Sequence, residues 1–506
     1  MSAEADIPTL SKRERTLVIW AALLALFLGA LDALIMSAAM PSIVAELGGL
    51  SLYAWVYSAY FLFRAVSLPV FGKLADIYDT RKLFLFSIVL FLISSVAAGM
   101  AYSMPFLIIC RVFQGIGAGG NFALVYIVLS EVAPPGKRAR TLSLGSTVWG
   151  ISSVIGPTLG GFIVSYFSWR WIFFINIPLG ILSLFGIAYF LRESGGREKQ
   201  KGSLDLAGLF FFSMSVLALL VIFTAGGREV AWTSVEMIVL MGTTVLLGVS
   251  FYRIERRVVD PMIKLRFFRN RNFSLGNGAI FFASVTIFSL FAYVPIYIQG
   301  SLGLSPMQVG LAMVSLSLGW SAGALYYGRM TRGGNEKNWS VAGGLVLLVG
   351  SLFTLRFDLQ TGMGECFLVF LLVGIGMGIV SLSTLILVQN SVTAKDLGIV
   401  TSFHQFGRSL GGTIGVGISG GLVTSALFRH LEKTAALLPP DLMVQLQQGA
   451  ENILRLEFQS QVPQATIELL REGVLSGVYS VFLVSSLASL CCLFCCLGLS
   501  GGAAQK

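Results

Sequence analysis

Charged residues are scarce in this sequence of 506 residues. They make up 12% of the chain, and 55% of the residues are hydrophobic. A soluble globular protein carries about 25% charged residues, so this chain has too little polar surface to cover itself in water. The composition excludes a soluble protein and predicts one that crosses a membrane several times.

Several functional motifs are also missing. No G-x-x-x-x-G-K-[ST] loop for phosphate occurs, which excludes ATP as the energy source. Four of the six cysteines cluster in CCLFCC, residues 491–496, with no histidine or carboxylate nearby. We expect them to pack as small apolar residues, with no disulfide framework, metal or cofactor. Neither the clustered polar residues of a membrane enzyme nor the filter segment of a channel stands out.

Fourteen apolar runs approach or exceed the length that crosses about 30 Å of hydrocarbon. They are continuously apolar rather than alternating, which favours α-helices over the strands of a barrel. Because further spans follow the first run directly, we expect no cleavable signal peptide. The runs lie at about 17–40, 52–72, 83–101, 106–129, 141–166, 171–191, 206–224, 235–252, 274–298, 307–327, 339–355, 366–388, 403–427 and 474–497.

Lysine and arginine are concentrated in every second connection between these runs. The tails and loops of one side hold 25 of them, and the short loops of the other side hold only Arg170, Arg228 and Arg356. By the positive-inside rule, both termini are predicted to be cytoplasmic, in a multi-pass protein of the cytoplasmic membrane. The net charge of +10 therefore orients the chain and does not indicate a nucleic-acid partner.

Two internal matches indicate a duplicated architecture. The Gly-Ile-Gly of residues 115–117 recurs at 374–376, an offset of 259, and Gly72 matches Gly328, an offset of 256. They fit two parallel six-helix halves with two inserted helices, an all-α arrangement of 14 helices. The expected parts are an N-terminal bundle at 1–192, inserted helices with a basic loop at 193–273, and a C-terminal bundle at 274–506 with a long external loop at 428–473. Within that loop, residues 441–458 have helical spacing of apolar residues.

Four charged residues lie inside the predicted helices: Asp32, Arg64, Arg111 and Arg408. Each costs roughly 2.5–3.5 kcal/mol to insert, so each is expected to have a partner or a wet cavity. At about 1.5 Å per residue, Asp32 and Arg111 reach a similar depth and can form an ion pair, for which Arg64 would compete. Arg408 is predicted within about a turn of its helix end, where it can snorkel. Asp32 is then either half of a static ion pair or a carboxylate that titrates.

The connection after the second run reads GKLADIYDTRK, with a turn at Gly72, a possible helix-end acceptor at Asp76 and a basic Arg81. It resembles the G-x-L-x-D-R-x-G-R-K loop of the major facilitator superfamily. CRVFQGIGAGG (110–120) resembles the R-x-x-Q-G-x-G element of that family, and GISSVIGPTLGG (150–161) its antiporter element. The segments LDALIMSAAMP (31–41), SWRWIFFINIPLG (168–180) and FGRSLGGTIGVG (406–417) resemble the 14-helix drug:proton antiporter branch.

This resemblance implies proton-coupled export of amphipathic or cationic organic compounds by alternating access, in a protein that we expect to be a monomer. The resemblance implies that Asp32 and Arg111 couple proton movement to transport. Two alternatives stay open, an exporter or flippase of a lipid or metabolite and an uncoupled facilitator, and Arg64 could mark a substrate with an anionic group. The residues predicted for the substrate site are Asp32, Met36, Arg64, Asn121, Trp149, Tyr293 and Phe403.

The glycines of the fifth run predict a conformational gate. Gly156 and Gly160 are four residues apart, so they share a helix face and allow close approach of a neighbour. Pro157 removes a backbone hydrogen bond and can bend the helix there. The alternative is generic membrane packing. The residues predicted for the gate are Gly72, Asp76, Arg81, Gly150, Gly156, Pro157, Gly160 and Gly161.

Overall fold

The computed structural model is almost entirely helical over the residues that it describes. These are 11–47, 52–134, 136–191, 205–226, 230, 232–258, 261, 263–304, 306–331, 335–393, 396–434 and 464–500. The long helices are α1 (Lys12–Leu47), α2 (Tyr53–Ile77), α3 (Thr80–Gly99), α4 (Met104–Glu131), α5 (Arg138–Tyr166), α7 (Asn176–Phe190), α8 (Leu206–Ala225), α9 (Val235–Glu255), α10 (Arg271–Ile296), α11 (Pro306–Met330), α12 (Glu336–Thr354), α13 (Met363–Asn390), α14 (Leu397–Thr434) and α17 (Gln464–Gly498). The short ones are α6 (Trp171–Phe174), η2 (Leu265–Arg269) and η3 (Tyr297–Ser301).

Each predicted apolar run coincides with a helix, and α6 joins α7 to complete the sixth. Eleven helical segments of the described chain are long and apolar enough to cross a membrane. The runs that are not among these eleven are α2, α5 and α12, which have 25, 29 and 19 residues. The all-helical fold is therefore confirmed, and the count of 14 spans stays a prediction.

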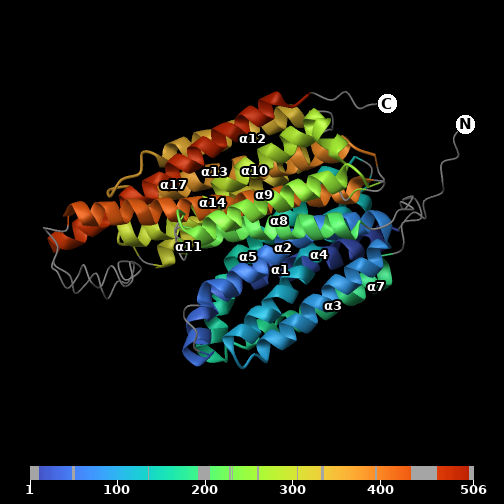
Figure 1. Ribbon diagram of the computed structural model, residues 1–506, viewed down its shortest axis with the longest axis horizontal. Coiled ribbons are helices and arrows are strands. Elements are labelled where there is room, and N and C mark those ends of the chain that lie inside the picture. Colours follow the sequence, from blue (N-terminus) through green and yellow to red (C-terminus); the bar gives the residue numbers. More distant parts are fainter. Residues whose placement is uncertain are drawn as a thin grey trace, which may run out of the picture.

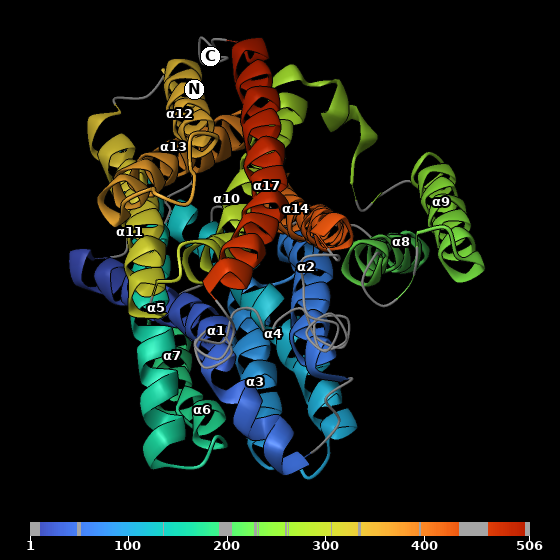
Figure 2. The same cartoon turned by 90° about the vertical axis from the view of Figure 1, so that its left-hand side faces the viewer.

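The helices form two bundles, seen one above the other in Figure 1. Helices α1 to α7 make the first bundle, and α10 to α14 with α17 make the second. The hairpin of α8 and α9 lies to one side, where α8 packs against both α2 and α14 (Figure 2). We call the end at which α1 begins and α17 ends the base. The bundles meet at the base and diverge toward the opposite end (Figure 1).

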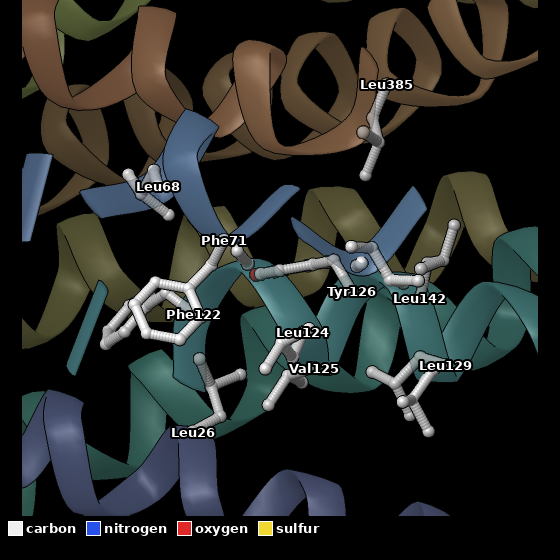
Figure 3. Packing of buried hydrophobic residues seen from close by; sticks show 14 of the residues in the cluster. Leu26, Leu68, Phe71, Phe122, Leu124, Val125, Tyr126, Leu129, Leu142 and Leu385 are labelled. Atoms are coloured by element: carbon white, nitrogen blue, oxygen red, sulfur yellow. The ribbon is translucent and has the colours of Figure 1, made fainter. Parts of the chain in front are cut away.

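Buried apolar side chains show the same asymmetry between the two ends. One cluster crosses between the bundles near the base and joins Tyr126 and Leu142 of the first bundle to Leu385 of the second (Figure 3). At the opposite end of the first bundle, a second cluster around Met36 and Trp169 contains residues of that bundle alone. Within the described residues, apolar packing thus holds the bundles together at the base.

Glycines in α4 and α13 set matching helix crossings in the two bundles. An added Cβ on Gly115 would collide with the carbonyl of Tyr60 in α2, and one on Gly374 would collide with the carbonyl of Leu316 in α11. Tyr60 and Leu316 are 256 residues apart, as are Gly72 and Gly328, so the sequence offsets correspond to equivalent places in the packing. These glycines let the backbones of two helices touch. Such close packing matters in a membrane, because the hydrophobic effect does not drive helices together there.

Helix ends differ from the sequence prediction in the second bundle. Helix α14 begins at Leu397 and continues to Thr434, and α17 begins at Gln464, so both helices extend into the loop predicted at 428–473. The apolar runs underestimate these helices because polar turns at their ends lower the local hydropathy. The helical segment predicted at 441–458 lies outside the described residues.

Candidate functional site

A buried ion pair lies in the middle of the first bundle. Nη1 of Arg111 in α4 donates to Oδ2 of Asp32 in α1 over 2.7 Å. The two side chains are 0% and 1% exposed. The structure thus brings together the two residues that the sequence placed at one depth.

Two amides complete the coordination of Asp32. Its Oδ1 accepts from Nε2 of Gln114 at 2.8 Å and from Nδ2 of Asn176 in α7 at 3.3 Å. Nη1 of Arg111 also donates to Oε1 of Gln114 at 2.8 Å. The charge of Asp32 therefore links α1, α4 and α7, and any change in its protonation alters hydrogen bonds to all three.

Arg111 has a second environment on α2. Its guanidinium lies 4.2 Å from the ring centroid of Tyr60, and its Nε donates to the carbonyl of Val56 over 3.4 Å. Its Nη2 has no hydrogen-bond partner within the described protein, and neither has Oδ1 of Asn176. The network is polar and buried but not saturated.

Arg64 does not compete for Asp32. It is 8% exposed and stacks on aromatic rings, with its guanidinium 4.7 Å from the centroid of Phe61 and 5.0 Å from that of Phe122. No carboxylate of the described residues lies within ion-pair distance of it, and its Nε and Nη1 have no hydrogen-bond partner there. Depth along the helix placed Arg64 near the level of Asp32, but its guanidinium lies against aromatic rings rather than against the carboxylate.

Arg408 also differs from its prediction. Helix α14 begins at Leu397, so Arg408 lies about three turns inside it rather than one. It is only 6% exposed, and its guanidinium lies 5.9–6.0 Å from the rings of Tyr126, Trp149 and Trp320. Arg408 is therefore buried between the bundles, and the snorkelling prediction is wrong.

The other residues predicted for the substrate site separate into two groups. Trp149 lies near the arginines, because it packs 5.5 Å from Phe122, whose ring centroid lies 5.0 Å from the Arg64 guanidinium. Asn121 instead contacts α3, where its Oδ1 accepts from the Ser87 hydroxyl at 2.7 Å. Met36 belongs instead to the apolar cluster at the far end of the first bundle. The remaining two lie in the second bundle, where Tyr293 donates to the carbonyl of Val416 and Phe403 stacks on Phe273. The structure does not gather Met36, Tyr293 and Phe403 around the arginines.

Asp76 connects the bundles at the base. It is 1% exposed, and its two carboxylate oxygens each accept a backbone N–H of α14, from Gly398 and Ile399, at 2.9 Å. These N–H groups belong to the first turn of a helix, where a negative charge is stabilised by the helix dipole. One turn earlier in α2, a Cβ on Gly72 would collide with Ser402 of α14. Arg81, in contrast, bonds within the first bundle, to the carbonyl of Ala188.

The glycines predicted for the gate in α5 have mixed environments. Gly150 lies against Ser321 of α11 and Gly156 against Leu34 of α1, so both allow close helix approach. Gly160 is buried, whereas a Cβ on Gly161 would have no atom within 4 Å. Helix α5 runs from Arg138 to Tyr166 through Pro157 without a break. The packing is compatible with a gate, and bending at Pro157 stays a prediction.

One hollow of about 520 Å³ lies on the side of the first bundle, between α1, α5 and α7. Its lining is apolar, with Trp20, Phe27 and Phe185 among the residues, and Arg64 is not one of them. Within the described residues no group of three or more His, Cys, Asp or Glu side chains could hold a metal ion.

Sequence reasoning missed several members of these sites. Gln114 and Asn176 lie in the motifs quoted above, but nothing in their spacing showed that they turn toward Asp32. Trp320 could have been found, because it follows Arg64 by the same offset of 256 residues that relates Gly72 to Gly328.

Two six-helix bundles that meet at one end, with a buried ion pair in one of them and an inter-bundle contact at the base, are typical of a membrane transporter. The family model of the Major Facilitator Superfamily matches residues 22–416, and the chain belongs to this superfamily. Two similar proteins are from Bacillus subtilis. The multidrug transporter protein MdtP is 32% identical, with 93% of this chain and 90% of the relative covered, and multidrug resistance protein 3 is 29% identical, with 95% and 94% covered.

The crystal structure of the human organic anion transporter MFSD10 shares the fold. The TM-score is 0.61 at 14% identity, and the match covers 94% of this chain and 99% of the other. It supports the arrangement of the bundles and says nothing further about this chain.

Proposed function

We propose that this protein exports amphipathic organic compounds from the cytoplasm in exchange for protons. Its similarity to two proteins named as multidrug transporters supports export of this substrate class. The distribution of lysine and arginine supports a cytoplasmic base. The state described here is then closed to the cytoplasm by Asp76 and the surrounding apolar packing.

The observation that carries the proposal is the environment of Asp32. A purely structural ion pair is most stable when every donor and acceptor around it is satisfied, because buried charges are costly otherwise. Here Arg111 keeps one free donor and Asn176 one free acceptor. A proton on Asp32 would release Arg111 from the ion pair and change the contacts of α1 with α4 and α7.

Protonation can thus be coupled to a helix rearrangement. In the outward-facing state the carboxylate would take up a proton from outside, and in the inward-facing state the re-formed pair with Arg111 would release it. One charge moved through the membrane potential is worth about 2.3 kcal/mol per 100 mV, which is enough to drive accumulation of a substrate against a gradient.

Asp32→Asn tests the coupling. The amide keeps the size and the hydrogen bonding but cannot titrate. Proteoliposomes are given a pH gradient, and proton movement is followed with a pH-sensitive dye after addition of ethidium or 1-naphthalenesulfonate. We expect at least one probe to drive proton movement with the parent and none to do so with Asp32→Asn.

Asp358→Asn, which changes an exposed carboxylate between α12 and α13, is the matched control and should behave as the parent. Equal proton movement in Asp32→Asn and the parent would contradict the role of Asp32. If the parent equilibrates the probes without moving protons, the protein is an uncoupled facilitator.

A further inference from the structure

Two arginines and two tryptophans lie at equivalent places of the two bundles. Trp320 of α11 follows Arg64 of α2 by 256 residues, the offset that relates Gly72 to Gly328. The crossing glycines agree, since an added Cβ on Gly119 would meet the carbonyl of Arg64 and one on Gly378 the carbonyl of Trp320.

Arg408 and Trp149 are the second pair, and they correspond at a different sequence offset. Gly72 packs against Ser402 of α14, and Gly328 packs against Ser143 of α5, so positions of α14 and α5 correspond at an offset of 259. At this offset Arg408 corresponds to Trp149. Helices α2 and α14 thus carry an arginine each at the bundle interface, and α5 and α11 carry a tryptophan each.

The four side chains are linked in space. The Arg408 guanidinium lies about equally far from both tryptophan rings, at 6.0 Å from Trp149 and 5.9 Å from Trp320. Trp149 packs 5.5 Å from Phe122, and the Arg64 guanidinium lies 5.0 Å from the same Phe122 ring. The guanidinium groups of Arg64 and Arg408 therefore flank the ring pair of Phe122 and Trp149, at the interface between the bundles.

Hydrogen-bond donors are in excess at this place. Nε and Nη1 of Arg64 and the indole Nε1 of both Trp149 and Trp320 are buried without a hydrogen-bond partner in the described protein. Arginine and tryptophan side chains have no acceptor, so only an acceptor-rich group can satisfy them.

No carboxylate of the described chain balances these charges. The buried ones are Asp32, Asp76, Glu255 and Asp396. Asp32 pairs with Arg111, Asp76 accepts from the start of α14, and Asp396 pairs with Lys264 over 2.6 Å. Glu255 lies at the last residue of α9, outside both bundles. Two uncompensated positive charges inside a membrane protein are expensive, and such residues mark a functional site.

We propose that Arg64 and Arg408 bind the anionic group of an aromatic organic anion, such as an aryl sulfonate or carboxylate. The planar guanidinium donates two parallel hydrogen bonds to such a group, and the indole rings of Trp149 and Trp320 accept the aromatic part by stacking. The proposal names the substrate class of the transporter proposed above and, to that extent, rests on it. Cationic compounds are repelled at this place.

Equilibrium binding tests the site without a proton gradient, so it does not depend on the coupling through Asp32. The protein is placed in phosphatidylcholine nanodiscs, and calorimetry measures binding of naphthalene-1-sulfonate. The comparison ligands are naphthalene-1-sulfonamide, which has the same ring but no charge, and methanesulfonate, which has the charge but no ring. We expect the sulfonate to bind about tenfold or more tightly than either, because charge-assisted hydrogen bonds and ring burial act together.

Variants assign the binding to the arginines. Arg64→Gln and Arg408→Gln should each weaken sulfonate binding about ten- to hundredfold and leave sulfonamide binding nearly unchanged. Arg64→Lys, which keeps the charge but loses the planar fork, should fall between Arg64→Gln and the parent. Arg429→Gln removes an exposed arginine of the same helix α14 and is the control. Because Gln removes an unpaired buried charge, these variants should fold at least as well as the parent.

Three results would overturn the proposal. The first is equal binding of sulfonate and sulfonamide by the parent. The second is sulfonate binding that Arg64→Gln and Arg408→Gln leave intact. The third is competition by phosphatidylglycerol in the nanodisc that disappears in Arg64→Gln, which would assign the site to a lipid phosphate. If Asp32→Asn abolishes proton movement but binds the sulfonate as the parent does, coupling and binding are separate, as proposed.

Discussion

The two bundles share a helix-crossing pattern but differ in what they bury. In α4 of the first bundle, Arg111 and Gln114 face Asp32. At the offset of 259 residues the corresponding positions of α13 are Phe370 and Val373, both 0% exposed. The glycines that set the crossing are present in both helices, so the fold requires the glycines and does not require the charges.

The second bundle holds the equivalent helix crossing without an ion pair. Its buried polar contacts include pairs of hydroxyl groups, such as Ser340 with Ser383 at 2.8 Å and Ser289 with Ser419 at 3.0 Å. Hydroxyl groups bond without the large desolvation cost of a charge. An ion pair buried at this crossing in only one of two equivalent bundles is therefore better explained by coupling than by stability.

The largest effect is expected from removing the cation of this network. Arg111→Met leaves the buried Asp32 carboxylate without a positive partner and should destabilise the protein by about 3–5 kcal/mol at neutral pH. Thermal unfolding in detergent measures the loss. The double variant Asp32→Asn/Arg111→Met removes both charges and should recover most of it.

Position 370 sharpens the comparison. Phe370→Leu, at the equivalent place of α13, loses only packing and should cost about 1–2 kcal/mol with no dependence on position 32. If Arg111→Met is as mild as Phe370→Leu, Asp32 is not held as a buried carboxylate and the contrast between the bundles fails.

Much of the fold, and the level of the Asp32–Arg111 pair, could be predicted from the sequence. Continuous apolar runs located every long helix, because a membrane span depends on local composition, and the repeated glycines indicated the duplicated halves. Depth along the helix also brought Asp32 to the level of Arg111. Depth is one-dimensional, however, and it cannot show which face of α2 carries Arg64.

The helix ends account for the other error. The run at 403–427 omitted the first turns of α14, because Thr401 and Ser402 lower the hydropathy there, although both are buried. Helix α14 begins earlier, where Asp76 of the other bundle binds its first N–H groups. A contact between residues more than 300 positions apart fixes that start, and no local pattern contains it.

A smaller effect is expected at the base, where the bundles again differ. Asp76 binds the first turn of α14, and the residue 256 positions later is Arg332, which cannot accept hydrogen bonds. Asp76→Asn keeps one acceptor oxygen but loses the charge at the helix N-terminus, which should weaken the contact by about 0.5–2 kcal/mol.

Because the contact exists only when the base is closed, Asp76→Asn should shift the population toward an open base about two- to thirtyfold. Distances between spin labels attached to α3 and α12 near the base measure this population. Asp79→Asn, which changes the cap of α3 within one bundle, is the control and should leave the distances unchanged. Unchanged distances in Asp76→Asn would show that apolar packing alone closes the base.

The smallest effect is expected at the other end of the first bundle, where a second ion pair lies in water. Arg170 donates to Glu46 over 2.6 Å, with the side chains 29% and 50% exposed, and Trp169 donates to the other carboxylate oxygen at 2.7 Å. The hydrogen bonds from Arg170 and Trp169 lower the pKa of Glu46 below its usual 4.5. A carboxylate with a lowered pKa stabilises the folded state above its unfolded pKa, and this contribution is lost as the pH falls through the folded pKa.

The pH dependence of stability due to Glu46 should therefore appear below about pH 4.5 and should be shallow, because exposed pairs contribute little. Thermal unfolding of Glu46→Gln and the parent, compared between pH 7 and pH 3.5, measures it. The difference should be small at pH 7, shrink toward zero at pH 3.5 and be reduced by salt at pH 7, unlike the effect of Arg111→Met. A difference that grows as the pH falls would mean that Glu46 is destabilising when charged, and the exposed pair would then differ from the buried one in sign as well as in size.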